Sequence, residues 1–201
     1  MTVLALGPLT NVALLVRAFP RLAERIERVL FMGGAIGPGN ATPVAEFNAW
    51  QDPEAVSVVV HSGIPVTMYG LDVFYAPRVG REDIQRLAGS DEPGARLVGR
   101  LLDVHARTEA GDGEPSDSTL GDAGAACLLA DPATGVATRY PVGVELAGSS
   151  RGQTVVDVRG RVGEGELHGA AHRSTEIEVV TSVDAEAMTA LYLRTVGGEP
   201  R

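Results

Sequence analysis

Short runs of consecutive apolar residues alternate with amphipathic stretches along the first third of the chain. The runs are residues 2–6 (TVLAL), 29–34 (VLFMGG) and 65–73 (PVTMYGLDV), and each contains or adjoins a glycine. Continuous apolar runs are typical of strands that a parallel sheet buries on both faces. The stretch after the first run has its apolar residues at helical spacing, at Leu9, Val12, Ala13 and Val16. We therefore predict alternating strands and helices, with the strands forming a mainly parallel sheet.

The pattern changes toward the C-terminus. Residues 135–148 and 152–160 alternate polar and apolar positions, which predicts two antiparallel strands joined as a hairpin. A further strand is predicted at 174–183 and a closing helix at 184–196, capped by Gly197-Gly198. The predicted fold class is α/β, an open and mainly parallel sheet flanked by helices with a C-terminal antiparallel hairpin. We predict a single domain over residues 1–201.

The middle region carries specific helix signals. Asp52, Pro53 and Glu54 predict a helix start, with Asp52 as the N-cap and proline at the first helical position. Residues 92–110 are predicted as one long amphipathic helix. We place its buried face along Leu97, Val98, Leu101, Leu102 and His105. Residues 111–122, rich in Gly, Pro and Ser, are predicted as a loop.

The balance of charge narrows the class of partner. The chain has 201 residues with 17 basic and 26 acidic side chains, a formal net charge of −9. A nucleic-acid surface needs a basic stripe that replaces counterions, so we exclude nucleic acid as a partner. No stretch reaches the roughly 18 apolar residues of a membrane span. The single cysteine, Cys127, is interpreted as a packing residue, and the lack of disulfides predicts a cytoplasmic protein.

The loop at residues 33–55 (GGAIGPGNATPVAEFNAWQDPEA) has the composition of a binding site. It leaves the carboxyl end of a predicted parallel strand, the edge at which such sheets bind ligands. Asn40, Glu46 and Asn48 place two amides and a carboxylate within nine positions. Amides donate and accept hydrogen bonds and a carboxylate accepts them, which suits the hydroxyl groups of a sugar. The alternative is that Asn and Gly serve turns here and that Glu46 is solvated.

Two further acidic residues lie beside predicted elements. Asp122 precedes the apolar run of Cys127 and is either an N-cap or an oxygen ligand of a hard cation such as Ca²⁺. Asp72 ends a predicted strand and is interpreted as a residue that caps a turn. The histidines lack the spacing of a metal-binding motif: they are His61, His105, His168 and His172. His105 is interpreted as a core or helix-edge residue.

Four segments in chain order carry a resemblance to a known family: LALGPLTNVAL, VLFMGGA with GNATPVAEFNAWQDPEA, VTMYGLDV, and LGDAGAACLLADP. Together they resemble the nucleoside hydrolases, the inosine–uridine-preferring nucleoside N-ribohydrolase family. The match runs from Leu4 to about Pro132 and continues more weakly through the hairpin. It implies an enzyme of purine and pyrimidine nucleoside catabolism that hydrolyses the N-glycosidic bond of a ribonucleoside to ribose and free base. It also implies calcium as the cofactor and a homo-oligomer, a dimer or tetramer, by family analogy.

The resemblance assigns roles to the residues that match the family motifs. Asn40 and Glu46 would hold the ribose 5′-hydroxyl, and Asn48 would hold the 2′-hydroxyl. Met32 would line the ribose pocket, with Phe47 packed beside it.

Two oxygen ligands of the metal follow from the same resemblance. Asp122 would bind calcium and contact the 3′-hydroxyl, and the backbone carbonyl of Leu6 would be a further ligand. The ion would lower the pKa of the attacking water and direct it. The polar groups would hold the ribose close to an oxocarbenium-like transition state.

The chain departs from the family pattern at two places. The family's first strand carries a DxDxxxDD motif that supplies the general base and most metal carboxylates, and this chain has no such motif. We therefore expect a fragment, incomplete at the N-terminus, whose activity is weak unless the chain is lengthened upstream. Many members also have histidine directly before the metal-binding aspartate, where this chain has Gly121. Glycine cannot protonate a leaving base, so the leaving-group acid and the base specificity stay unassigned.

Two other functions remain open. A non-catalytic nucleoside- or sugar-binding or interaction module would keep the polar loop without a general base. An unrelated α/β hydrolase is a weaker alternative, because we identify no G-x-S-x-G nucleophile elbow, no P-loop and no G-x-G-x-x-G fingerprint. A DxDxxxDD-coding stretch in frame upstream of Met1 would favour the nucleoside hydrolase over the binding module.

Overall fold

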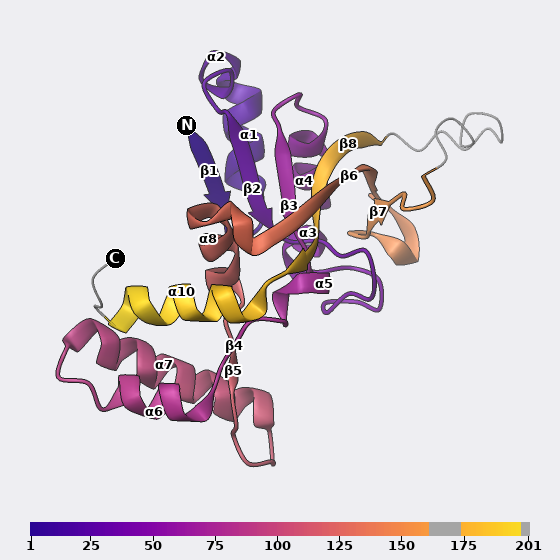
Figure 1. Cartoon of the computed structure of the whole chain (residues 1–201). Coiled ribbons are helices and arrows are strands. Elements are labelled where there is room, and N and C mark those ends of the chain that lie inside the picture. The colour runs from indigo at the N-terminus through magenta and orange to yellow at the C-terminus, as the bar shows by residue number, and fades with distance from the viewer. Residues whose placement is uncertain (161–173, 198–201) are drawn as a thin grey trace. The chain divides into compact units, whose positions relative to one another are not determined.

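The computed structural model describes residues 1–160 and 174–197, and Figure 1 shows its helices and strands. The chain divides into two compact units. The first unit comprises Met1–Val73 and Val136–Ser182, and the second comprises Phe74–Gly135 and Val183–Arg201. Gly198, which we predicted as part of a helix cap, lies outside the described residues.

The first unit is built on a six-stranded sheet with the order β1-β2-β3-β8-β6-β7 (Figure 1). β1, β2, β3 and β8 run parallel to one another, with Val3 level with Val29 and Val29 level with Val66. β6 and β7 pair in antiparallel fashion, as predicted for the hairpin. The strand bounds are Thr2–Ala5 (β1), Arg28–Met32 (β2), Val66–Tyr69 (β3), Gly135–Val144 (β6), Thr154–Val156 (β7) and Thr175–Val183 (β8). The predicted α/β class with a mainly parallel sheet is confirmed.

Helices α1 (Thr10–Ala18) and α4 (Pro53–Val60) pack against each other and share a core with the sheet. Phe31 and Met68 are fully buried there, and burying such a side chain stabilises a fold by about 1.5–3 kcal/mol. α4 begins as predicted, because Asp52 Oδ1 accepts a hydrogen bond from Ala55 N at 3.0 Å. The shorter helices of this part of the chain are α2 (Pro20–Ala23), α3 (Phe47–Gln51), α5 (Leu71–Phe74) and the 3₁₀ turn η2 (Gly148–Ser150).

The third predicted strand is shorter than the apolar run that suggested it. β3 ends at Tyr69, and the residues from Leu71 onward form α5 instead of continuing the strand. The backbone turns here because Leu71 N donates to the carbonyl of Gly34 at 3.0 Å. A side chain at Gly70 would meet that carbonyl at 3.1 Å, so the glycine permits the close approach. Periodicity in the sequence does not report such a contact between distant segments.

The second unit is mainly helical, and α6 and α7 lie side by side in it (Figure 1). A side chain at Gly99 of α7 would meet the backbone nitrogen of Ala88 at 2.2 Å, so glycine allows α6 and α7 to touch. β4 and β5 form a short antiparallel ribbon, and β5 lies inside residues 111–122, which we predicted as a loop. The bounds are Arg78–Val79 (β4), Arg81–Ala88 (α6), Pro93–Ala110 (α7), Ser118–Thr119 (β5), Asp122–Ala130 (α8), Pro132–Thr134 (η1) and Ala185–Gly197 (α10).

The predicted buried face of α7 is only partly right: Leu102 is buried and Val98 packs against the core, but the other three predicted residues are exposed. Leu97 and Leu101 are 58% and 60% exposed, and His105 is exposed as well. The face that packs into the core carries Ala95, Gly99, Leu102 and Ala106. Both faces have helical spacing in the sequence. Small residues decide between them, because they let α6 approach more closely than a row of leucines would.

Candidate functional site

The loop that leaves β2 is held in place by its own backbone amides. Every N–H group from Gly33 to Gly37 donates a hydrogen bond of 2.8–3.1 Å, and the acceptors come from three other segments of the first unit. The acceptors, in order along the loop, are Tyr69 O, Glu46 Oε2, Thr154 Oγ1, Asp72 Oδ2 and Asp72 Oδ1. A segment whose backbone N–H groups all donate hydrogen bonds has few alternative conformations. Residues 33–37 therefore form a rigid base for the rest of the loop.

Glu46 is buried inside this arrangement, with only 2% of its surface exposed. Its Oε1 accepts from Asn48 N at 2.8 Å, and its Oε2 accepts from Gly34 N and Ala49 N at 3.0 Å each. Glu46 is therefore the N-cap of α3 and also a link between the two ends of the loop. The alternative in which Glu46 is a solvated turn residue is wrong.

Hydrogen bonds to the backbone orient both asparagine amides of the loop. Asn40 Oδ1 accepts from Phe47 N at 2.8 Å, so its Nδ2 is the group turned away from the backbone. Asn48 Nδ2 donates to Met32 O at 3.0 Å and lies 3.4 Å from Met32 Sδ, which leaves Oδ1 on the other side. Within the described residues, no hydrogen bond uses Asn40 Nδ2 or Asn48 Oδ1. The loop thus keeps one amide donor and one amide acceptor for another molecule.

The other predicted residues of the first unit lie around the same sheet edge. Met32 is the last residue of β2 and is buried. Leu6 follows β1, and the pairing of Ala5 with Phe31 makes Leu6 level with Met32. Phe47 is half exposed and its ring centroid lies 6.2 Å from that of Trp50. These side chains and the Leu6 carbonyl are therefore close neighbours of the loop, as the carboxyl ends of parallel strands require.

Asp122 belongs to the second unit, where it is the first residue of α8. Gly121 occupies the N-cap position, so the interpretation of Asp122 as an N-cap is wrong. Partial desolvation by nearby protein atoms raises the pKa of its carboxyl group, while the side chain stays open to solvent. Its carboxylate is thus available to a ligand rather than committed to the helix end.

Gly121 also limits what can precede Asp122. Its φ is +58°, a conformation that L side chains rarely adopt, and a Cβ there would meet Phe74 Cζ at 2.9 Å. A histidine at this position would therefore need a different local backbone. The segment is held by Arg78 of β4, whose guanidinium donates to Asp117 at 2.8 and 3.0 Å and to Thr119 Oγ1 at 2.6 Å. The backbone in front of Asp122 is thus anchored to β4.

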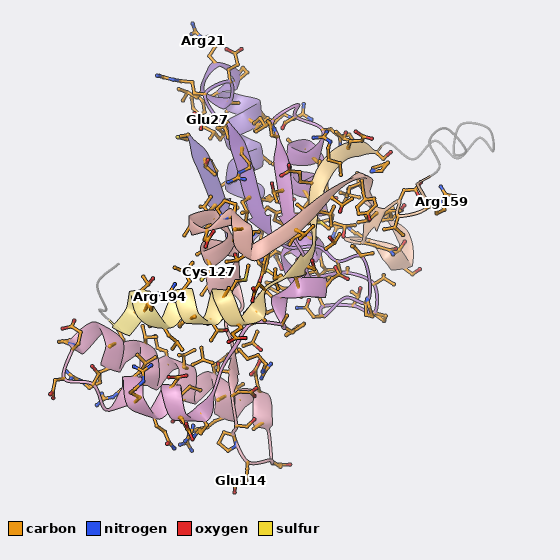
Figure 2. The ribbon with its side chains drawn as sticks, viewed as in Figure 1. Arg21, Glu27, Glu114, Cys127, Arg159 and Arg194 are labelled. Carbon is orange, nitrogen blue, oxygen red and sulfur yellow. The ribbon has the colours of Figure 1, made fainter. Side chains whose placement is uncertain are left out.

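The remaining titratable candidates have structural roles. Asp72 caps the loop amides of Ile36 and Gly37, which confirms a structural role, although the capped loop precedes Asp72 and is not a following turn. Cys127 is buried in α8 (Figure 2), and burial raises the pKa of its thiol, as expected for a packing residue. His105 Nδ1 lies 2.9 Å from Ser118 Oγ and joins α7 to β5. His168 and His172 lie outside the described residues.

Residues 148–152 (GSSRG) match the G-x-S-x-G spacing of a serine-hydrolase elbow, so the expectation that the chain has no such motif is wrong. A nucleophile elbow places its serine on a sharp turn between a strand and a helix. Here Ser150 ends the 3₁₀ turn η2 between the antiparallel strands β6 and β7. The structural context of a serine nucleophile is therefore missing from this motif.

Thr154 is the residue of this site that sequence reasoning missed. Its hydroxyl contacts Ala35, which is 119 positions away in the chain. A threonine in an alternating strand carries no signal of such a contact, because strand propensity alone accounts for it.

No helix among residues 1–160 and 174–197 combines the length and the apolarity needed to cross a bilayer.

Comparison with known proteins agrees with the geometry of the loop. The model of the family described as inosine-uridine preferring nucleoside hydrolase matches residues 1–190. The chain is 41% identical over 167 residues to the pyrimidine-specific ribonucleoside hydrolase RihA of Citrobacter koseri, covering 78% of this chain and 51% of that protein. It is 50% identical over 103 residues to RihA of Shewanella oneidensis, covering 51% of this chain and 32% of that protein. The chain thus spans about half the length of the relative from Citrobacter koseri.

Solved structures show the same fold. A plant nucleoside hydrolase, the PpNRh1 enzyme, is similar with a TM-score of 0.85 at 25% identity, covering 97% of this chain and 61% of that one. An inosine-guanosine nucleoside hydrolase (IG-NH) is similar with a TM-score of 0.81 at 27% identity, covering 96% and 60%. The resemblance inferred from the motifs is confirmed, and the chain belongs to the inosine-uridine preferring nucleoside hydrolase family.

Proposed function

We propose that this chain binds the ribose of ribonucleosides and takes part in the hydrolysis of their N-glycosidic bond to ribose and free base. One observation carries the proposal: the backbone orients the amides of Asn40 and Asn48 so that a donor and an acceptor remain available. A sugar hydroxyl uses both kinds of partner, because it donates one hydrogen bond and accepts others. The family match over residues 1–190 supports the same chemistry.

In this proposal the loop after β2 holds the sugar. Asn40 Nδ2 donates to the 5′-hydroxyl beside Glu46, and Asn48 Oδ1 accepts from the 2′-hydroxyl. Met32 and Phe47 supply the apolar surface beside the ring. Because Glu46 and its backbone partners make the loop rigid, these groups need little rearrangement as positive charge develops on the ribose.

Calcium is the cofactor in this proposal, with Asp122 and the Leu6 carbonyl among its ligands. When bound, such an ion lowers the pKa of a water molecule and directs its attack. A calcium site needs roughly six to eight oxygen ligands. The described parts of the chain contain no group of three or more His, Cys, Asp or Glu residues that could hold a metal. They do not complete a calcium site by themselves, and no sugar-binding step above is assigned to the ion.

The finer features of the proposal concern substrate range and assembly. We place pyrimidine ribonucleosides first among the substrates, because the RihA relatives are described as pyrimidine-specific. The proposal also treats both units as parts of one domain of a cytoplasmic homo-oligomer.

A second candidate function is a nucleoside-binding module without catalysis. The backbone of Gly121 favours it, because a φ of +58° and Phe74 Cζ at 2.9 Å from a Cβ disfavour a histidine, the proton donor of many family members, directly before Asp122. Binding in this case depends on the same asparagines, and only bond cleavage distinguishes the two functions.

The experiment measures binding and ribose release in parallel. Uridine, cytidine and inosine are tested by titration calorimetry and by a reducing-sugar assay, with calcium and with EGTA. Asn40→Asp is the sharpest variant, because a carboxylate still accepts from Phe47 N while the donor Nδ2 is lost. Asn11→Asp, an exposed residue of α1, is the matched control for the charge change.

We expect uridine to bind, Asn40→Asp to weaken binding at least about tenfold, and Asn11→Asp to leave it unchanged. Ribose release that EGTA abolishes supports the hydrolase. Binding without release supports the binding module. If none of the three nucleosides binds, both functions are wrong.

A further inference from the structure

The β6–β7 hairpin contacts both ends of the segment that carries the proposed sugar-binding residues. At one end, Thr154 of β7 bonds to Ala35 in the loop after β2. At the other end, Arg151 and Gly152 in the hairpin turn contact the junction of α3 and α4. All of these residues belong to the first unit. The hairpin therefore holds both ends of the segment in place, although the hairpin lies about a hundred residues away in the chain.

The hydroxyl group of Thr154 is fully used in this contact. It accepts from Ala35 N at 2.9 Å and donates to Ala35 O at 2.8 Å, and only 3% of the residue is exposed. Neighbouring Gly34 has φ of +72°, and a Cβ there would meet Thr154 Cγ2 and Oγ1 at 2.9 Å. The loop thus lies directly against the threonine, and both backbone groups of Ala35 depend on one side chain.

The contact at the other end is weaker. Arg151 Nη2 donates to both carboxylate oxygens of Glu54 at 3.0 and 2.8 Å, but both side chains are substantially exposed. Exposed ion pairs of this kind contribute little. A Cβ at Gly152 would meet Trp50 Cα at 2.6 Å, so the turn lies against α3. Thr154 is therefore the hairpin residue that is buried and holds the segment through hydrogen bonds of its side chain.

A short path connects Thr154 with the proposed sugar-binding amides. Ala35 is held by Thr154, and the adjacent Gly34 N donates to Glu46 Oε2. Glu46 in turn accepts from the backbone of Asn48. If Ala35 is released, the loop segment whose Gly34 N–H donates to Glu46 loses its hydrogen bonds to Thr154. The orientation of Asn48 then depends on a less ordered carboxylate.

We infer that Thr154 is a positioning residue for sugar binding, acting through Ala35 and Glu46 without touching the ligand. This inference rests on the proposed function of the loop. It predicts that the hydroxyl group of Thr154, rather than its contribution to stability, determines how well a ribonucleoside binds.

The test compares three variants in the full chain. Thr154→Val removes the hydroxyl at nearly constant shape, and Thr154→Ser restores it. Thr67→Val is the matched control, because Thr67 is also 3% exposed and its hydroxyl donates to Glu178 Oε2 at 2.8 Å, in the same unit but not to the loop. The measurements are the Kd for uridine, hydrogen exchange of residues 33–37 and the unfolding temperature.

We expect Thr154→Val to raise the Kd at least about tenfold and to lose exchange protection at Gly34 and Ala35. Thr154→Ser should restore both to within about threefold of wild type. Thr67→Val should lower the unfolding temperature without changing the Kd or the exchange of the loop. If Thr154→Val does not fold, Thr154→Ala serves in the same comparison.

Two outcomes would overturn the inference alone: a wild-type Kd in the hydroxyl-free Thr154 variant, or an equal loss of affinity in Thr67→Val. If the wild-type chain does not bind uridine or another ribonucleoside, the proposed function falls, and this inference falls with it.

Discussion

Replacing the buried Glu46 by glutamine tests the central contact of the loop. The carboxylate accepts three backbone hydrogen bonds, from Gly34, Asn48 and Ala49. In Glu46→Gln, one oxygen becomes an NH₂ group that cannot accept. The best arrangement keeps the amide oxygen where two N–H groups converge and turns the NH₂ toward Asn48 N. That leaves one buried donor facing another donor.

The expected loss of stability follows from these contacts. An unpaired buried donor costs about 1–3 kcal/mol, and hydrogen bonds to a neutral acceptor are weaker than those to a charged one. Loss of a negative charge at the start of α3 adds about 0.3–1 kcal/mol. The sum is about 1–4 kcal/mol. With a urea slope of about 2 kcal/mol per M, the midpoint should fall by about 0.5–2 M.

Trp50 provides the assay, because it is the single tryptophan and lies in α3. Its fluorescence during urea unfolding reports on the first unit. Glu54→Gln is the control, since it makes the same chemical change in an exposed pair with Arg151 and should cost at most about 1 kcal/mol. If Glu46→Gln is no more destabilising than Glu54→Gln, the assigned role of Glu46 is wrong.

Three further predictions concern other parts of the chain. Asn48→Asp should lower both stability and uridine affinity in the same assays, because an oxygen would then face the Met32 carbonyl; unchanged stability would contradict the Nδ2 contact. Hydrogen bonds from Arg78 lower the pKa of Asp117 below its usual 3.8, so this pair stabilises the fold above that pH and the contribution is lost as the pH falls through the lowered pKa. The stability difference between wild type and Arg78→Met, followed by circular dichroism, should therefore shrink below about pH 4; a constant difference would exclude this linkage. Buried Cys127, whose thiol pKa is raised, should react with Ellman's reagent only as the second unit opens, and a rapid reaction in the native chain would refute its burial.

Much of the fold could be predicted from local patterns. Continuous apolar runs identified β2 and the start of β3, alternation identified the β6–β7 hairpin, and Asp52-Pro53 identified the start of α4. These signals are local because burial on both faces, strand alternation and helix capping each act over a few residues. The loop motif also identified the family, which the match over residues 1–190 confirms.

The buried face of α7 could not be predicted in the same way. Leu97 and Leu101 have the spacing and hydrophobicity of core residues, yet the core lies against Gly99 and its small neighbours. Which stripe of a helix is buried depends on the shape of the partner, and a single helix does not contain that information.

The sequence by itself determined the type of most elements, the mainly parallel sheet and the polar composition of the loop after β2, because each depends on neighbouring residues. Only the tertiary structure decided what the polar residues do. It showed that Glu46 pairs with the backbone, that the two amides have defined orientations, and that Thr154 holds Ala35 from a distant hairpin. The physical reason is that hydrogen bonds are directional and need partners at about 3 Å, and chain folding alone brings partners from distant segments to that distance.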